Sequence, residues 1–160
     1  MVDVKEHLVF PTPINEFKYE LTNSERDYIF YLLELSNTFQ TSDNLNHKFE
    51  LSNFTDCIQK SCEQVITNQG YQFDKVEITG MWANGLKKGE THAPHTHSNN
   101  FLSGVYYVVA SEFSSPIQFF DPRPQASILR PRVEKMSNLN SSMIQFNSVK
   151  NVGFIFPSWL

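Results

Sequence analysis

The 160-residue chain lacks any apolar run long enough to cross a bilayer, and its N-terminus, MVDVKEHLVFPTP, lacks the hydrophobic stretch of a secretory signal peptide. It also lacks a cluster of basic residues, and its net charge is −4. Clustered lysine and arginine are what attract a protein to a nucleic-acid backbone, so nothing here indicates such a partner. These absences argue against membrane, secreted and nucleic-acid-binding proteins, and we expect a soluble cytoplasmic protein.

Cysteine is scarce, because the chain contains only Cys57 and Cys62. Both lie in one predicted helix, where side chains five positions apart point about 140° away from each other. The two thiols therefore do not bridge each other easily. We interpret them as reduced, which fits a reducing compartment such as the cytoplasm.

The chain is rich in hydrophobic and aromatic residues. Hydrophobic residues make up 40% of it, charged residues 19%, and there are 14 phenylalanines. This composition and length predict a single domain, residues 1–160, with a sizeable core. Within it, residues 1–70 are expected to form an N-terminal strand and helices, and residues 71–160 a core of strands. The predicted class is α+β, mainly β.

Two helices are predicted in the N-terminal part. Thr22 and Glu25 have the spacing of a capping box, and apolar residues with helical spacing follow, which predicts a helix over 23–36. A second amphipathic pattern predicts a helix over 52–69, and Gly70 is well placed to end it. We expect both helices to pack on one side of the sheet system.

From residue 71 onward the sequence is typical of short strands separated by glycine and proline turns. After a possible short strand at 17–20, the predicted strands cover 76–82, the segment of histidines at 92–97, 102–109, 117–120, 143–146 and 153–157. Many short strands at intervals of about ten residues predict a sandwich or a jelly roll.

The histidine segment is the strongest candidate for a functional site. His92, His95 and His97 immediately precede the apolar run Leu102–Val109, which predicts a buried strand. If the segment is extended, His95 and His97 point the same way with their Cα atoms roughly 6.5–7 Å apart, and both imidazoles can reach one metal ion. The alternative is a pair of solvated rings on a polar loop or strand edge. His92 is expected to be a surface residue or, at most, a neighbour of the ligands.

Three motifs follow one another in a specific order: HxHxxxxLSGVYYV, then FFDPRP, then GFIFPSWL, with MWANGLKKGE upstream. Over residues 75–160 this order resembles a family of 2-oxoglutarate/Fe(II)-dependent oxygenases known largely from marine bacteria and their phages. The resemblance implies a double-stranded β-helix, which is a jelly roll, and we expect the two N-terminal helices to pack on its sheet. It also implies Fe(II) as cofactor and 2-oxoglutarate as co-substrate.

The resemblance implies a set of metal ligands that this chain matches only in part. The wider superfamily holds its metal with two histidines and a carboxylate. His95 matches the first histidine, and His97 stands where the carboxylate usually lies. Either both histidines bind the metal or a carboxylate comes from elsewhere, for which Asp121 is the weaker candidate, since Asp before Pro is also a common turn. The distal histidine is expected after Leu160, so we expect a C-terminally incomplete, truncated jelly-roll core.

Three further residues are weaker candidates for contacts with the co-substrate. Tyr106 or Tyr107 would point into the barrel, since neighbours on a strand alternate, although both also suit core packing. Arg123 has the planar fork that pairs with a carboxylate, but it could equally clamp Asp121 or a backbone carbonyl. Trp82 and Asn84 could line the mouth of the site.

The predicted function is therefore a dioxygenase-like protein that couples hydroxylation to the oxidative decarboxylation of 2-oxoglutarate, and inactivity of this truncated chain stays open. The alternatives are a cupin-type module that binds a metal or small ligand, and a catalytically dead jelly-roll domain. No stretch of the sequence identifies the substrate. An exposed strand at the sheet edge could pair two copies into a homodimer.

Overall fold

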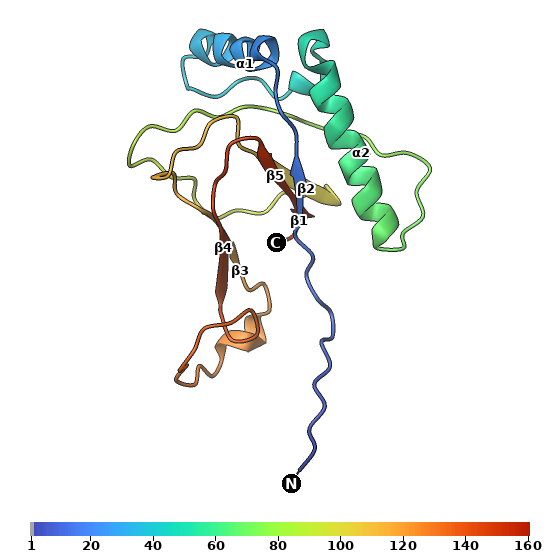
Figure 1. Ribbon diagram of the computed structural model, residues 1–160, viewed down its shortest axis with the longest axis vertical. Coiled ribbons are helices and arrows are strands. Elements are labelled where there is room, and N and C mark those ends of the chain that lie inside the picture. The colour runs from blue at the N-terminus through green and yellow to red at the C-terminus, as the bar shows by residue number, and fades with distance from the viewer. Residues whose placement is uncertain (1) are drawn as a thin grey trace.

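The computed structural model describes residues 2–160, and Figure 1 shows two helices above a small sheet, a second pair of strands below it and an N-terminal segment that extends away. The helices are α1 (Asn23–Leu35) and α2 (Ser52–Asn68), and the strands are β1 (Asn15–Lys18), β2 (Leu102–Tyr106), β3 (Ile117–Phe120), β4 (Met143–Phe146) and β5 (Val152–Pro157). Short 3-10 helices cover Leu45–His47, Phe49–Leu51 and Pro124–Ser127. The named strands pair antiparallel, so the fold is α+β, as predicted.

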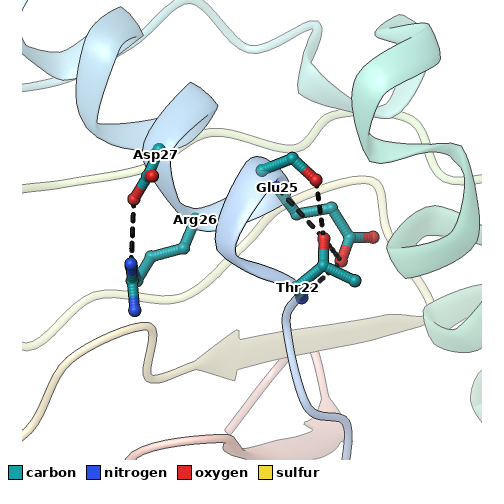
Figure 2. Close-up of polar contacts among 5 residues, drawn as sticks. Thr22, Glu25, Arg26 and Asp27 are labelled. Atoms are coloured by element: carbon teal, nitrogen blue, oxygen red, sulfur yellow. Dashed lines mark hydrogen bonds and ion pairs between the residues drawn. The ribbon is translucent and has the colours of Figure 1, made fainter.

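The start of α1 is fixed by the predicted capping box (Figure 2). The amide of Glu25 donates to Oγ1 of Thr22 at 3.2 Å, and the amide of Thr22 donates to Oε2 of Glu25 at 2.8 Å. Glu25 is only 3% exposed, yet its carboxylate is satisfied, because the hydroxyl of Tyr19 donates to its other oxygen at 2.9 Å. The cap thus also ties α1 to the end of β1.

The end of α2 is fixed by Gly70, which has φ +77°. The amide of Tyr71 donates to the carbonyl of Ile66 at 3.2 Å, and the amide of Gly70 donates to the carbonyl of Thr67 at 2.9 Å. These two bonds form a Schellman motif, which satisfies carbonyls that the helix itself cannot pair. The predicted stop of this helix is confirmed within one residue.

β5 is the central strand of a three-stranded sheet, with β1 and β2 on either side. Phe17 of β1 and Tyr106 of β2 both pair with Gly153, and their rings lie 6.0 Å apart in a stacked arrangement. From α2, the ring of Phe54 packs 4.6 Å from that of Tyr106. α2 therefore covers this face of the sheet, as expected, whereas α1, which we also expected there, packs through a separate cluster of buried residues.

The opposite face of β5 meets the two-stranded sheet of β3 and β4. Successive side chains of a strand point to opposite faces, so Phe154 and Phe156 lie on this side while Gly153 lies on the other. Phe156 lies 4.8 Å from the ring of Phe119, and Phe154 lies 5.1 Å from that of Phe146. With Val152, these phenylalanines build the main aromatic core.

A second buried cluster, which we call the α1 core, lies against α1. Its buried members are Ile29, Leu33, Leu45 and Leu51. Met81 and Ala83 pack against this cluster from a distant part of the chain. Residues 2–160 therefore contain two clusters of buried residues, one on the sheet and one on α1.

The strand predicted over residues 76–82 is wrong, and so is the strand predicted over the histidine segment, because no strand forms between residues 71 and 101. Two isolated bridges replace a ladder there, Gln40 with Asn84 and Asn44 with Met81. Met81, one of the apolar residues of that pattern, instead packs on the α1 core. The predicted strand 102–109 is also shorter, since β2 ends at Tyr106.

Among residues 2–160, no helix combines the length and the apolar character that a membrane crossing requires. Cys57 and Cys62 are both free thiols, as their spacing on α2 predicted. Burial raises the pKa of the Cys62 thiol to about 11, so this cysteine is held in its protonated, unreactive form.

The packing of two rings over Gly153 leaves no room for a side chain. A Cβ at this position would lie 2.3 Å from Cε1 of Phe17 and 2.9 Å from the carbonyl oxygen of Val105. We predict that Gly153→Ala lowers the free energy of unfolding by about 1–3 kcal/mol, as overpacking does elsewhere. Urea denaturation measures the effect, and Gly80→Ala is the matched control, because a Cβ there meets its nearest atom at 3.6 Å. Adding Phe17→Leu should restore part of the loss; equal stability of both alanine variants would contradict the prediction.

Candidate functional site

The histidine segment is held to the end of β5 by backbone hydrogen bonds. The amide of His97 donates to the carbonyl of Ser158 at 3.0 Å, and the amide of Ser158 donates to the carbonyl of Phe101 at 3.2 Å. The hydroxyls of Ser158 and Ser103 lie 2.7 Å apart, and Ser158 is only 2% exposed. The HxH motif and the FPSWL motif, which are about 60 residues apart in the sequence, therefore meet at one place.

His95 and His97 form a pair although their segment is not a strand. Their ring centroids lie 4.9 Å apart, with 69° between the ring planes. Nδ1 of His95 lies 2.8 Å from the carbonyl oxygen of Ala93, and since a carbonyl can only accept, Nδ1 carries the proton. The neutral His95 ring consequently has its lone pair on Nε2, which is the arrangement found in metal-binding histidines whose other nitrogen is held by a second group.

His97 is the more sheltered member of the pair. The ring of Trp82 lies 6.1 Å from that of His97, and the exposed His95 covers another side. Burial, and then the proximity of His95, lower the pKa of His97 below its usual value. A metal ion binds only the neutral imidazole, so a lowered pKa keeps His97 in the binding form at neutral pH.

The chemistry of this pair fits part of an iron site. Two neutral imidazoles inclined to each other can place one nitrogen each on adjacent positions around a metal ion, at roughly 2.1 Å from it. Within residues 2–160 as described, however, no group of three or more histidine, cysteine, aspartate or glutamate side chains is arranged to hold a metal. The geometry thus supplies two nitrogen donors, and Asp121 does not join them in a three-ligand group.

Asp121 and Arg123 instead bind each other just after β3. Nε and Nη2 of Arg123 donate to the two carboxylate oxygens of Asp121 at 2.9 and 2.8 Å, and the Arg123 amide donates to Oδ1 at 3.0 Å. These hydrogen bonds lower the pKa of Asp121. The clamp was one of the two roles expected for Arg123; its contact with the co-substrate, like the metal role of Asp121, stays a prediction.

Tyr106 and Tyr107 lie on opposite faces of the sheet, as the alternation of a strand requires. The hydroxyl of Tyr106 lies 2.7 Å from the carbonyl of Tyr19 and 3.1 Å from Oδ1 of Asn151, and burial raises its pKa to about 12. Tyr107 packs on the aromatic core, where burial also raises its pKa. Both side chains serve the fold in this structure, and a contact of either with the co-substrate stays a prediction.

The sequence pointed to some residues near the histidine pair and not to others. Trp82 is predicted at the mouth of the site, and the structure places its ring against that of His97. For Ser158 the sequence showed only that it belongs to the GFIFPSWL motif, and it predicted no role for this residue. A cleft of about 160 Å³ has walls formed by residues 38–40 and 84–87 together with Glu90 and His92. The sequence did not predict that residues 38–40 line a cleft, because a polar, turn-rich sequence is also typical of an ordinary loop.

Comparison with protein families gives a match over the second half of the chain. The protein-family model described as "Putative 2OG-Fe(II) oxygenase" matches residues 80–160, which is just over half of the chain and includes both histidines of the pair. No curated protein matches the sequence. The matched range begins close to residue 75, where the resemblance of the motifs was expected to begin.

The ion pair after β3 yields a prediction about pH. The pKa of Asp121 lies below its ordinary value because Arg123 stabilises the carboxylate, so the folded state binds this proton less readily than the unfolded state. The pair therefore stabilises the fold above the unfolded pKa of about 3.9, and this contribution disappears as the pH falls through the folded value. We expect this contribution to be small, since the Arg123 side chain is 73% exposed and solvent screens the pair.

NMR titration of the Asp121 carboxyl carbon measures this effect. Arg123→Gln should move the pKa of Asp121 up towards its ordinary value. Arg132→Gln is the control, because the pKa shift of Asp121 is caused by Arg123 alone among the cations of the described chain. An unchanged titration in the Arg123 variant would show that the clamp does not persist in solution.

Proposed function

The chain belongs to the "Putative 2OG-Fe(II) oxygenase" family, and on that premise we propose that it is an Fe(II)- and 2-oxoglutarate-dependent dioxygenase that holds its metal with His95 and His97. The observation that carries this proposal is the pairing of the two imidazoles, 4.9 Å apart, against the end of β5. A pair of solvated loop histidines would need neither the fixed tautomer of His95 nor the sheltered ring of His97.

The metal and co-substrate, when bound, would supply the chemistry of hydroxylating a C–H bond while 2-oxoglutarate is decarboxylated. The protein's own residues supply position and shelter. The carbonyl of Ala93 holds the proton on Nδ1 of His95, so that Nε2 would be the nitrogen that binds the metal. Ser158 fixes the backbone of His97, and Trp82 limits the access of water to its ring. A third ligand is expected from a residue outside this pair.

The proposal extends to the fold. The antiparallel packing of β1, β5 and β2 against β3 and β4 is compatible with the core of a double-stranded β-helix, and we assign the strands to that jelly roll on the strength of the family. The free thiols support a cytoplasmic, reducing compartment. The identity of the substrate stays open, and a homodimer formed through a sheet edge stays a prediction.

One specific observation favours a second candidate function. The HxH pair that precedes strand β2 also fits a metal-binding module of the cupin type, and such a module would bind metal without turning over 2-oxoglutarate. The two functions differ in whether 2-oxoglutarate binds to the metal, so a single titration separates them.

The test is metal binding to the wild-type chain, His95→Ala and His97→Ala, with His92→Ala as the matched control from the same exposed segment. Co(II) serves as the oxygen-stable probe, and quenching of tryptophan fluorescence reports binding, because Trp82 contacts His97 and Trp159 follows Ser158. Loss of an outer-shell partner typically weakens metal binding 10- to 100-fold, so loss of either ligand should cost at least about 100-fold. The control should bind like the wild type.

A second titration, with Fe(II) under anaerobic conditions, adds 2-oxoglutarate. A charge-transfer absorption band that appears with 2-oxoglutarate and not with succinate would support the dioxygenase, since only the keto acid chelates the metal through its keto group. Metal binding without that band would favour the binding module. Binding that survives both histidine substitutions, or no binding at all, would contradict the assignment of the site.

A further inference from the structure

The cleft near the histidine pair is built from two segments clamped together by hydrogen bonds. The amide of Thr41 donates to the carbonyl of Ala83 at 3.0 Å, and the amide of Ala83 donates to Oγ1 of Thr41 at 3.0 Å. The amide of Gly85 donates to the carbonyl of Phe39 at 2.7 Å. Thr41 is itself buried, so the clamp is sheltered from competing water. The wall of the cleft is therefore a fixed surface.

Phe39 is held in an unusual conformation at the cleft. Its φ is +53°, in the left-handed region that a bulky residue rarely adopts. Gly85 permits this arrangement, because even a Cβ at that position would lie 3.3 Å from Cδ1 of the Phe39 ring. Strain of this kind persists only where the surroundings enforce it, and it is concentrated at binding and catalytic sites.

The ring of Phe39 contacts a positively charged side chain. The Lys87 ammonium lies 4.8 Å from the centre of the Phe39 ring, in a cation–π contact. Within the described chain, Lys87 forms no ion pair. The nearby Glu90 uses Oε2 to accept the backbone amide of Lys87 at 2.8 Å, which fixes the turn. The cleft thus presents a positioned cation whose charge no carboxylate neutralises directly.

Short stretches of chain connect this cleft to the histidine pair on two sides. His92 lines the cleft and precedes His95 by three residues. Three residues of fully extended chain span about 10 Å, which is the largest separation possible between the two. Asn84 also lines the cleft, and Trp82, two residues earlier, contacts the ring of His97. A group bound in the cleft is therefore close enough for the rest of a small molecule to reach the pair.

We propose that this cleft is the subsite that binds an anionic end group of the substrate, a carboxylate or a phosphate, with Lys87 as the recognising residue. The inference rests on the proposed oxygenase function and adds the chemical class of the substrate. A volume of about 160 Å³ accommodates one such group and not a whole ligand of typical size, whose pockets measure about 300–1,000 Å³. The remainder of the substrate then extends towards the metal site.

The test uses the metal-free full chain with acetate and inorganic phosphate as separate probes, so that binding does not depend on iron. Amide NMR shifts of Phe39 and Gly85 report occupancy of the cleft. Lys87→Met keeps most of the length of the side chain and removes its charge. Lys88→Met is the matched control, since Lys88 is the adjacent lysine and does not line the cleft. We expect Lys87→Met to weaken binding about tenfold, the effect of losing one charge-assisted hydrogen bond, and Lys88→Met to leave it unchanged.

Glu90→Gln provides a change of opposite sign. The glutamine oxygen can still accept the amide of Lys87, while one negative charge is removed from the wall, so anion binding should tighten several-fold. The probe that binds more tightly identifies the source of the charge as carboxylate or phosphate. Equal binding to wild type and Lys87→Met, equal shifts with neutral acetamide, or no shift at Phe39 and Gly85 would overturn the subsite.

The double variant His95→Ala/His97→Ala separates the two proposals. It should still bind the anion in the cleft while it loses metal. If metal binding fails in the wild type and the anion still binds through Lys87, the proposed function is wrong and the anion site stands. If metal binds as expected and the anion does not, only the subsite is wrong.

Discussion

The antiparallel pairing of β5 with both of its neighbours is the interaction on which the other parts of the molecule depend. It brings β1, near the start of the chain, and β2, from its middle, to the two sides of one strand. The absence of a side chain at Gly153 lets Phe17 and Tyr106 stack, and that stack receives Phe54 of α2. The same strand continues into Ser158, which holds the backbone of His97. One strand therefore determines both the packing of the sheet and the position of the histidines.

The local features of the fold could be predicted because their causes lie within a few residues. A capping box needs only Thr22 and Glu25 at the right spacing, and a Schellman motif needs only Gly70 after a helical pattern. The α+β class, both helices and the strands at 117–120 and 143–146 followed from the same local patterns. Family membership followed from motifs that lie within residues 80–160.

The features that could not be predicted depend on contacts between distant segments. Met81 fits a strand pattern, but it packs on the α1 core together with Ala83, and the sequence does not say which partner it finds. Asp121 and Arg123 carry the side chains of a ligand and a co-substrate clamp, yet here they satisfy each other. The cleft at Phe39 needed a residue 46 positions upstream of Gly85 to come within hydrogen-bond reach of it, which no local pattern reveals.

The two separate buried clusters have a consequence for how the molecule opens. They contain different buried residues, so each can behave as its own cooperative unit, with its own free energy of opening. The histidine pair lies between the two clusters. Trp82 follows Met81, which packs on the α1 core, and Ser158 follows the strand β5 of the aromatic core. An ion shared by the pair would be a cross-link between the two units. Backbone amides in both units would then be protected from hydrogen exchange together, and the α1 unit would no longer unfold independently.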